Sequence, residues 1–298
     1  MNALRRIITN LLLFGVVLPA LLPGISGAEQ LRITITQDQK DAARKYKPLL
    51  DYLAKKGITP SYVETKDYAD AAVLFAEGAV DAMFCGSGVA GTFMISELAV
   101  PLVRPVNMEG HSTYWAVILA PKGSPLFAGS ADYFKGKRVI FTRLASSGEF
   151  YFNSLPGAAQ SDAIRIKADN HGDAIEALEK GQADIAIVKN RVWDTVRHKY
   201  PDLMMVGEDK GENPDGTLIV SANMPVSLKA KISADLLAMQ NDRSPEAQAV
   251  KSSMKISGFI KTSDKDFEHT LALLKKAGVT RSFMFAQKPA SVSALKRP

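Results

Sequence analysis

The sequence has little cysteine and histidine. Its single cysteine, Cys85, leaves no partner for a disulfide within the chain. Its four histidines, His111, His171, His198 and His269, show no metal-ligand spacing. Neither a phosphate-binding loop motif nor a G-x-S-x-G nucleophile elbow occurs. The sequence therefore gives no support for a disulfide scaffold, a metal site or these common catalytic sites.

Long hydrophobic runs are scarce as well, and the exception lies at the start of the chain. Arg5 and Arg6 precede an apolar run over residues 11–22, and small residues lead up to Ala28. This run is too short and too interrupted for a comfortable membrane span. The pattern is typical of a secretory signal peptide over residues 1–28, cleaved near Ala28, with an uncleaved anchor as the alternative. We expect the mature protein in the periplasm.

Charge of one sign is not concentrated either. The 298 residues carry a formal net charge of +6, which falls to +4 when the two arginines of the leader are removed. This excess is too small and scattered to indicate nucleic-acid binding, but it favours the entry of anions into a cleft. The remaining 298 − 28 = 270 residues are enough for two domains with proper cores.

The most informative feature present is a repeat. Residues 71–84 and 174–187 both read as an apolar helix, a glycine and an Asp-led buried strand, with Gly78 and Gly181 separated by 103 positions. That distance is too long for a solenoid repeat. The repeat therefore predicts two similar α/β lobes, and two lobes create a cleft in which a ligand binds.

Alternation, helical periodicity and breaker residues predict the elements of both lobes. Strands are expected at 31–36, 61–64, 80–84, 100–106, 114–119, 138–142, 163–167, 185–188 and 217–221. Helices are expected at 41–56, 68–78, 89–98, from 147, and at 173–180, 191–200, 227–240, 245–254 and 264–277. The predicted fold is α/β, with two lobes that each contain a mostly parallel sheet flanked by helices.

The turn-rich segment 120–125 marks the first crossover between the lobes, and the strand at 217–221 marks the return. These positions predict one lobe from 29–120 plus 222–298 and a second lobe from 121–221. The tail over 288–298 is expected to be a solvated end.

The segment 143–148 is the best candidate for an anion site, because it lies between a predicted strand and a predicted helix. Backbone N–H groups at a helix start, the helix dipole and the hydroxyls of Ser146 and Ser147 can together hold a phosphoryl or carboxyl group beside Gly148. The alternative is that these serines only cap the helix.

The segment 86–91 matches G-x-G-x-x-G, and Glu109 lies near the distance of a ribose-binding acid. A dinucleotide site is disfavoured, because the preceding strand is the third of its lobe. The same glycines allow a ligand to approach the backbone at the sheet edge, which makes Ser87 a candidate contact.

Cys85 is expected at the same edge, with His111 and His171 facing the cleft. A thiol and an imidazole can form a nucleophilic pair, which would make the protein an exported enzyme. The alternative is a buried cysteine that acts as a small hydrophobe.

Three aromatic residues, Tyr68, Tyr114 and Trp115, lie at element boundaries. A tyrosine offers an anion a donor and an alkyl group a flat wall. The alternative for each is a place in the core.

The order and separation of several segments resemble those of the phosphate/phosphite/phosphonate family of periplasmic substrate-binding proteins of ABC transporters. The segments are Lys66-Asp67-Tyr68-Ala69, the Gly-x-x-Asp entry at Gly78, Tyr114-Trp115-Ala116-Val117, Ala145-Ser146-Ser147-Gly148, Asn170-His171 and Asn213-Pro214-Asp215. The resemblance implies a type II periplasmic-binding-protein fold whose lobes close on a small oxyanion. It also implies ligand contacts at Ser146, Ser147, Tyr68, Tyr114 and His171.

Two positions depart from the members of this family that recognise an aminoalkylphosphonate. Those relatives place acids around the ammonium group; Asp215 matches one such position, whereas Arg191 stands where the other acid is expected. Ala145 also replaces a hydroxyl residue. A cation at position 191 suits a ligand with additional negative charge.

The resemblance implies a non-catalytic, monomeric carrier that needs no cofactor. It would bind a phosphonate, phosphite, phosphate or phosphate ester and present it to an ABC permease. The alternatives are delivery to a membrane sensor, binding of a carboxylate or sulfonate, and an exported enzyme that uses Cys85 or Glu149.

Overall fold

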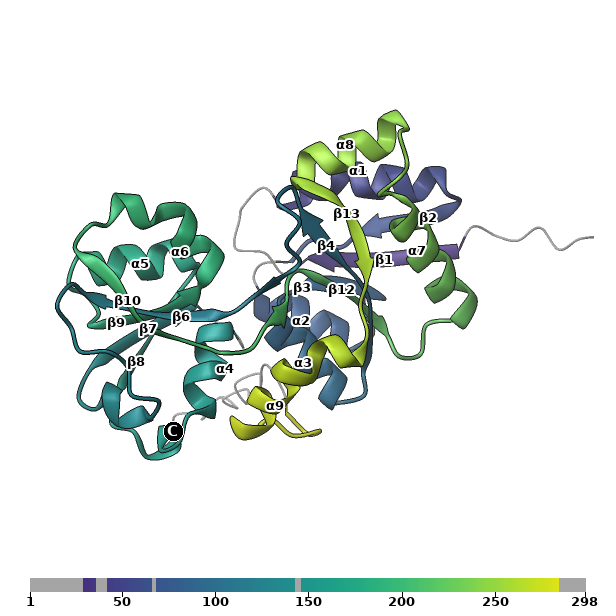
Figure 1. The fold of residues 1–298 in the computed structure, drawn as a ribbon. Helices are drawn as coiled ribbons and strands as arrows, with labels where there is room; N and C mark the ends of the chain where they lie inside the picture. The colour runs from purple at the N-terminus through teal and green to yellow at the C-terminus, as the bar shows by residue number, and fades with distance from the viewer. Residues whose placement is uncertain (1–28, 36–41, 66–67, 143–145, 284–298) are drawn as a thin grey trace, which may run out of the picture.

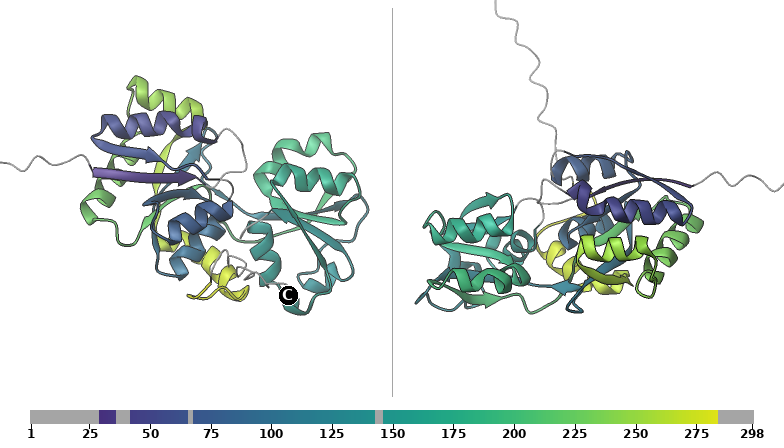
Figure 2. Two further views of the ribbon diagram at one scale, coloured as in Figure 1. Left: turned by 180° about the vertical axis from the view of Figure 1, so that it is seen from behind. Right: turned by 90° about the horizontal axis from the view of Figure 1, so that it is seen from above.

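The computed structural model describes residues 29–35, 42–65, 68–142 and 146–283, which form two α/β lobes (Figure 1). The predicted leader and the predicted tail at 288–298 lie outside these ranges. Each lobe has a central β-sheet with helices on both faces, as the views from behind and from above show (Figure 2). The two-lobed α/β architecture predicted from the repeat is therefore confirmed.

The first lobe is built on a six-stranded sheet with the order β13-β4-β12-β3-β1-β2. Its strands are β1 (Glu29–Ile35), β2 (Ile58–Tyr62), β3 (Ala82–Cys85), β4 (Ala99–Asn107), β12 (Thr217–Ser221) and β13 (Ile256–Lys261). The second lobe is built on a five-stranded sheet with the order β10-β6-β9-β7-β8. Its strands are β6 (Ala116–Pro121), β7 (Arg138–Thr142), β8 (Ile164–Ala168), β9 (Ile185–Lys189) and β10 (Leu203–Glu208).

Both sheets are mixed, which corrects the expectation of mostly parallel sheets. Strands β2, β1 and β3 are parallel in the first sheet, and β8, β7 and β9 are parallel in the second. The strands beside them, β12, β4 and β13 in one lobe and β6 and β10 in the other, pair antiparallel. Strands β6 and β12 each follow a passage between the lobes and begin beside the carboxyl end of a parallel strand. They therefore run in the opposite direction to that strand.

The chain passes between the lobes at a third, two-stranded sheet. It pairs β5 (Thr113–Tyr114) with β11 (Asn213–Pro214), with Tyr114 opposite Asn213. Because β6 belongs to the second sheet and β12 to the first, the boundaries predicted at 120/121 and 221/222 are wrong. The division falls instead at β5 and β11, because sheet membership rather than the turn-rich segment at 120–125 decides where a lobe begins.

The helices cover both faces of each sheet. In the first lobe α1 (Ala42–Lys55), α7 (Val226–Ala238) and α8 (Pro245–Met254) pack on one face, and α2 (Tyr68–Ala76) and α3 (Ser87–Ile95) on the other. In the second lobe α4 (Ser147–Ser154) packs on one face, and α5 (His171–Glu179) and α6 (Asn190–Val196) on the other. Short 3-10 helices lie at Ala131–Phe134, Ala158–Gln160, Arg197–Lys199 and Asp264–Phe267.

Helix α9 (Glu268–Lys276) joins the two cores. Its Leu271 packs with the core between α2, α3 and the first sheet, whereas Leu273 and Leu274 pack with the core beneath α4. A side-chain hydrogen bond of 2.7 Å from Thr270 to Asn213 also attaches this helix to β11. Helix α9 therefore braces the segment between the lobes.

The repeat has a physical basis in one ion pair per lobe. Arg32 on β1 donates to Asp81 at 2.6 Å, and Arg138 on β7 donates to Asp184 at 2.7 Å. Each aspartate follows its glycine by three residues, and both glycines have the positive φ that favours glycine, +71° at Gly78 and +67° at Gly181. Arg32 and Arg138 also donate to the carbonyls of Gly78 and Gln182. The same bidentate contact thus fixes the turn between helix and strand in both lobes.

Three strands were not predicted. Strand β11 lies within a segment predicted to be a loop, and β10 and β13 lie in stretches for which no strand was predicted. In β13, Gly258 weakens the strand pattern, yet the structure requires it, because an added Cβ would lie 3.0 Å from the backbone Cα of Gln240.

Replacing Gly148 with alanine is expected to lower the free energy of unfolding by about 1–3 kcal/mol. The new Cβ would lie 2.3 Å from the Ile187 carbonyl oxygen, a backbone atom that cannot turn away. Gly86→Ala is the matched control, because no atom lies within 4 Å of its added Cβ. Urea unfolding of the two variants checks this, and equal midpoints would contradict close packing at Gly148.

Candidate functional site

The candidate site lies where parallel strands end and helices begin. In the second lobe β7, β8 and β9 lead into α4, α5 and α6, and in the first lobe β3 leads into α3. Carboxyl ends of parallel strands share one edge of a sheet, where α/β proteins bind ligands. Of the predicted contacts, Ser87, Ser147, His171 and Arg191 all belong to the first turns of these helices.

The two serines at the start of α4 have different roles. Ser146 is the N-cap, and its hydroxyl donates to the Thr142 carbonyl at 2.8 Å and accepts from the Glu149 amide at 3.2 Å. Ser147 is buried, and its hydroxyl has no hydrogen-bond partner among the described residues. The capping alternative therefore applies to Ser146, whereas Ser147 retains a hydroxyl for a ligand.

Gly148 follows in the first turn of α4 and lies against the backbone of Ile187. Its lack of a side chain brings α4 close to β9. Because the first N–H groups of a helix have no partner within the helix, this close packing holds such donors at the carboxyl edge of the sheet. Ala145, the neighbouring departure from the family pattern, lies outside the described residues.

Tyr114 connects the lobes through its hydroxyl. It is 1% exposed, and its hydroxyl is 2.5 Å from the Ser87 hydroxyl at the start of α3. The Ser147 hydroxyl also interacts with the Tyr114 hydroxyl and lowers its pKa, although its geometry does not complete a hydrogen bond. Burial raises the pKa of Tyr114, so the phenol stays protonated at neutral pH and can donate a hydrogen bond to an anion.

The strongest electrostatic contact in this region involves Lys189, which the sequence analysis did not identify as a site residue. Its ammonium lies 2.8 Å from the Asp215 carboxylate and 4.2 Å from the centre of the Tyr114 ring. Lys189 is the last residue of β9. A lysine at the carboxyl end of a predicted buried strand was the one sequence feature that could have indicated a site residue here.

Asp215 follows β11 and is half-buried. Burial raises its pKa, but the charge and hydrogen bond of Lys189, together with Arg191 and His171, outweigh burial, so the pKa lies below its usual range. Asp215 is therefore ionised at neutral pH and already paired.

Arg191 is the second residue of α6, and its guanidinium donates to the Thr113 carbonyl on β5. This contact holds a cation beside the passage between the lobes. The guanidinium charge acts on Asp215, which places both residues in the same electrostatic environment.

His171 begins α5 and is 8% exposed. Its Nδ1 has no hydrogen-bond partner among the described residues. Burial, and to a smaller extent the charge of Lys189, lower the pKa of His171 to about 3, and the Asp215 charge opposes this decrease only in part. The imidazole is therefore neutral at neutral pH and has one ring nitrogen with an unused capacity for hydrogen bonding.

Thr217 Oγ1 is a third buried polar atom without a partner among the described residues. It lies opposite Cys85 in the pairing of β12 with β3, at the carboxyl end of β3. Thr217 begins a predicted strand, and nothing in the sequence indicated that its hydroxyl would belong to a candidate site.

Neither of the other two predicted aromatic contacts, Tyr68 and Trp115, presents a polar atom that the structure describes as available to a ligand. Tyr68 begins α2, but its side chain is outside the described structure. Trp115 is half-buried and donates from its indole to the Glu208 carboxylate at 2.9 Å, so its polar atom already has a partner.

The residues of the enzymatic alternative do not form a catalytic group. Cys85 is buried in the core on the α3 face, and burial strongly raises the pKa of its thiol. His111 is exposed and lies 3.5 Å from the Glu109 carboxylate. Glu149 is paired with Lys167 at 2.9 Å.

The remaining features of the described residues do not add a competing site. They contain no cluster of three metal-ligating side chains and no helix long and apolar enough to cross a membrane. In the glycine-rich segment, Gly91 permits helix packing, because an added Cβ would lie 2.6 Å from the Leu274 side chain.

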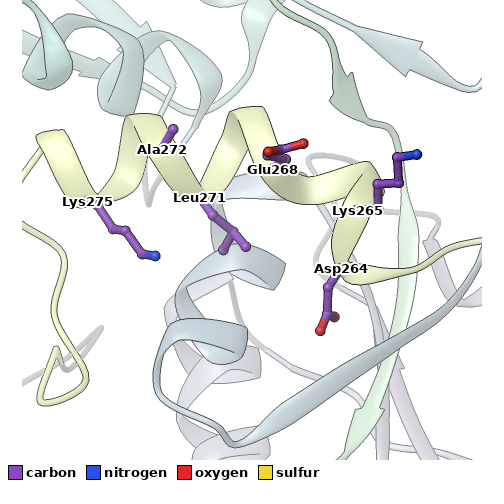
Figure 3. Close-up of a pocket in the computed structure, with 6 residues that line it drawn as sticks. All are labelled: Asp264, Lys265, Glu268, Leu271, Ala272 and Lys275. Atoms are coloured by element: carbon purple, nitrogen blue, oxygen red, sulfur yellow. The ribbon is translucent and has the colours of Figure 1, made fainter.

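A pocket of about 540 Å³ lies along the last helical segment (Figure 3). It is lined by Asp264, Lys265, Glu268, Leu271, Ala272 and Lys275. The charges of its two acids and two lysines cancel, and none of the candidate ligand-binding residues lines this pocket.

The pH dependence of stability is expected to report the burial of His171. An unfolded histidine has a pKa of about 6.5, so between about pH 7 and pH 4 the unfolded chain takes up a proton that folded His171 does not. The free energy of unfolding should therefore fall by about 2 kcal/mol from this residue between pH 7 and pH 5.

A His171→Gln variant should lose this part of the pH dependence in urea unfolding. His198→Gln, which replaces an exposed histidine, should keep it. Identical pH profiles for the wild type and His171→Gln would contradict the buried neutral imidazole.

Comparison with known proteins connects this geometry to a family. Residues 31–267 match the family model of the ABC transporter, phosphonate, periplasmic substrate-binding proteins. None of the curated protein sequences matches the chain.

Solved structures share the fold at low sequence identity. A Xanthomonas citri protein bound to ATP has a TM-score of 0.69 at 18% identity, with 84% of this chain and 98% of that chain covered. PhnD1 from Prochlorococcus marinus in complex with methylphosphonate has a TM-score of 0.65 at 13% identity, covering 84% and 99%. A binding component of an ABC phosphonate transporter from Pseudomonas aeruginosa has a TM-score of 0.63 at 16% identity, covering 84% and 87%. The family model matches more than half of the chain, and the chain therefore belongs to the phosphonate periplasmic substrate-binding proteins of ABC transporters.

Proposed function

We propose that the cluster around Tyr114 binds the tetrahedral oxyanion of a small phosphonate, phosphite or phosphate ester. One observation carries this proposal: Ser147 Oγ and His171 Nδ1 are both buried without partners among the described residues, at the starts of two helices on one sheet edge. A buried polar atom without a partner costs about 1–3 kcal/mol, and a ligand that completes the hydrogen bond removes this cost.

The anion is held by dipoles and by a lysine. The first N–H groups of α4 and the hydroxyls of Ser147 and Tyr114 would donate to its oxygens, and the positive end of the helix dipole favours negative charge there. Lys189 adds a full positive charge above the Tyr114 ring. Such donors are effective because they are already oriented and largely excluded from water.

The two lobes contribute different parts of this site. Ser87 belongs to the first lobe and Ser147 to the second, while Tyr114 lies on the strand that joins them. A rotation about β5 and β11 would bring α3 and α4 together around the ligand. The carrier would present this closed form to an ABC permease in the periplasm, as a monomer released by cleavage near Ala28.

The ligands of similar proteins support the phosphorus oxyanion. PhnD1 from Prochlorococcus marinus is in complex with methylphosphonate, and the Xanthomonas citri protein is bound to ATP. Both ligands carry tetrahedral phosphorus with ionised oxygens, whereas a planar carboxylate lacks the third oxygen that such a site can engage.

Delivery to a membrane sensor remains the second candidate. A histidine kinase sensor domain shares the fold with a TM-score of 0.52 at 15% identity. The same binding physics serves both roles. Neighbouring genes for a permease and an ATPase would favour uptake.

Ser147→Ala is expected to weaken binding of methylphosphonate by about 10–100-fold, the value of one hydrogen bond to a charged group. The melting temperature without ligand should stay nearly constant, because the hydroxyl completes no hydrogen bond with any of the residues that the structure describes. Isothermal titration calorimetry measures the affinity, with phosphite and phosphate as alternative ligands.

Ser146→Ala is the matched control, and its expected result is the reverse. Loss of the N-cap should lower the free energy of unfolding by about 1 kcal/mol while the affinity changes little. Unchanged affinity in Ser147→Ala, for a ligand that binds the wild type, would exclude this hydroxyl from the site.

Cys85→Ala tests the further proposal that the protein is a carrier without catalytic activity. The thiol is buried, and its substitution should leave the dissociation constant of the ligand unchanged within a factor of about two. Chemical modification of the bound ligand by the wild type, abolished in Cys85→Ala, would establish an enzyme instead.

A further inference from the structure

The charge distribution around Asp215 determines which substituent the ligand can carry. The Lys189 ammonium lies 2.8 Å from this carboxylate, so the chain itself already supplies the cation that Asp215 pairs with. A ligand ammonium would have to displace Lys189 or share one carboxylate with it. Placing two cations beside one acid in a half-buried site is unfavourable, because like charges repel and water screens them poorly.

Arg191 adds a second cation near Asp215. Its guanidinium donates to the Thr113 carbonyl, which fixes its position at the start of the passage between the lobes. A guanidinium has five N–H donors in a rigid fork, so one contact with a carbonyl leaves further donors that match a carboxylate or phosphate.

Lys45 contributes a third positive charge from α1, at the lobe opposite Lys189. It is half-buried, and burial and Lys255 lower its pKa while the Asp215 carboxylate raises it.

The nearby acids do not reverse this balance. Asp215 is paired with Lys189. Glu212 is exposed and accepts a hydrogen bond of 2.6 Å from the Thr113 hydroxyl. Because solvent screens an exposed charge, Glu212 weakens the field of Arg191 only in part. His171 is neutral at neutral pH and adds no charge.

We propose that the ligand is a phosphonate or phosphate ester whose substituent carries a second anionic group, and that Arg191 is the specificity-determining residue that receives it. This inference rests on the proposed function, since it assumes that the phosphorus oxyanion occupies the start of α4. The Lys189–Asp215 pair then discriminates against an aminoalkyl substituent, because it occupies the carboxylate that an ammonium group needs.

Three phosphonates that share a two-carbon unit on phosphorus test the proposal by calorimetry at neutral pH and low salt: 2-carboxyethylphosphonate, ethylphosphonate and 2-aminoethylphosphonate. We expect the carboxyethyl compound to bind about tenfold more tightly than ethylphosphonate, and the aminoethyl compound to bind about tenfold more weakly. Equal affinities, or tightest binding of the aminoethyl compound, would overturn the proposal.

Substitutions test whether Arg191 causes the preference for 2-carboxyethylphosphonate. Arg191→Gln should reduce the affinity for 2-carboxyethylphosphonate to about that for ethylphosphonate, which itself should change by less than about threefold. Arg197→Gln, an exposed arginine in the following 3-10 helix, is the control for net charge and should preserve the tenfold preference. A preference that survives Arg191→Gln would overturn the role of this residue.

Lys189→Met supplies the converse test. Removing the ammonium frees Asp215, so binding of 2-aminoethylphosphonate should improve relative to ethylphosphonate by about tenfold. An unchanged ratio would show that the Lys189–Asp215 pair does not discriminate against ammonium groups. Loss of folding is checked by circular dichroism, and Lys189→Gln then provides the same comparison with a hydrogen-bonding side chain at Asp215.

The phosphonates with an uncharged alkyl substituent distinguish a failure of this inference from a failure of the proposed function. If ethylphosphonate and methylphosphonate bind but the carboxyethyl compound gains nothing, the second-anion inference fails while the proposed function stands. If no phosphonate, phosphite or phosphate binds the wild type, the proposed function fails and the inference fails with it.

Discussion

The pairing of the two segments that join the lobes is the constraint on which the site depends. Strands β5 and β11 lie side by side, with Tyr114 opposite Asn213, so residues a hundred positions apart are held together where the lobes meet. Asn213 is fully buried and is held from α9 by Thr270. This fixed pairing places Tyr114 between helices of both lobes and Asp215 beside the end of β9. In the proposed closure, the lobes would rotate about this pairing while the residues on its axis keep their positions.

Around this hinge, burial and charge act together. Burial keeps His171 neutral and the Tyr114 phenol protonated, so both can serve as hydrogen-bonding groups and not as charges. Lys189 keeps Asp215 ionised and compensates its charge. The site therefore presents oriented dipoles toward the start of α4 and a positive balance beside Arg191. The proposed site would attract an anion while selecting for its shape and for the charge of its substituent.

Much of the fold follows from local patterns. Gly78 and Gly181 were predicted to end their helices, and each occupies the left-handed conformation that glycine tolerates best. The aspartate that follows each glycine forms an ion pair with an arginine of the same lobe. Strands β10 and β13 were missed, because they are stabilised by antiparallel neighbours far away in the sequence and not by a strong pattern of their own. The lobe boundaries were misplaced for the same reason, since the turn-rich segment at 120–125 is a stronger local signal than the short pairing of β5 with β11.

The sequence by itself determined the two α/β lobes, the family, and the helix starts at which Ser87, Ser147 and His171 lie, because a strand followed by a polar or glycine-rich turn and a helix is a local signal. Only the tertiary structure decided that Ser146 is a cap whereas the Ser147 hydroxyl has no hydrogen-bond partner within the described part of the chain, since adjacent serines look alike in a sequence. It also decided that Lys189 pairs with Asp215. Lys189 and Asp215 are 26 positions apart in the sequence, and they meet only because the lobes and their joining strands pack together. A local sequence pattern therefore cannot predict this ion pair.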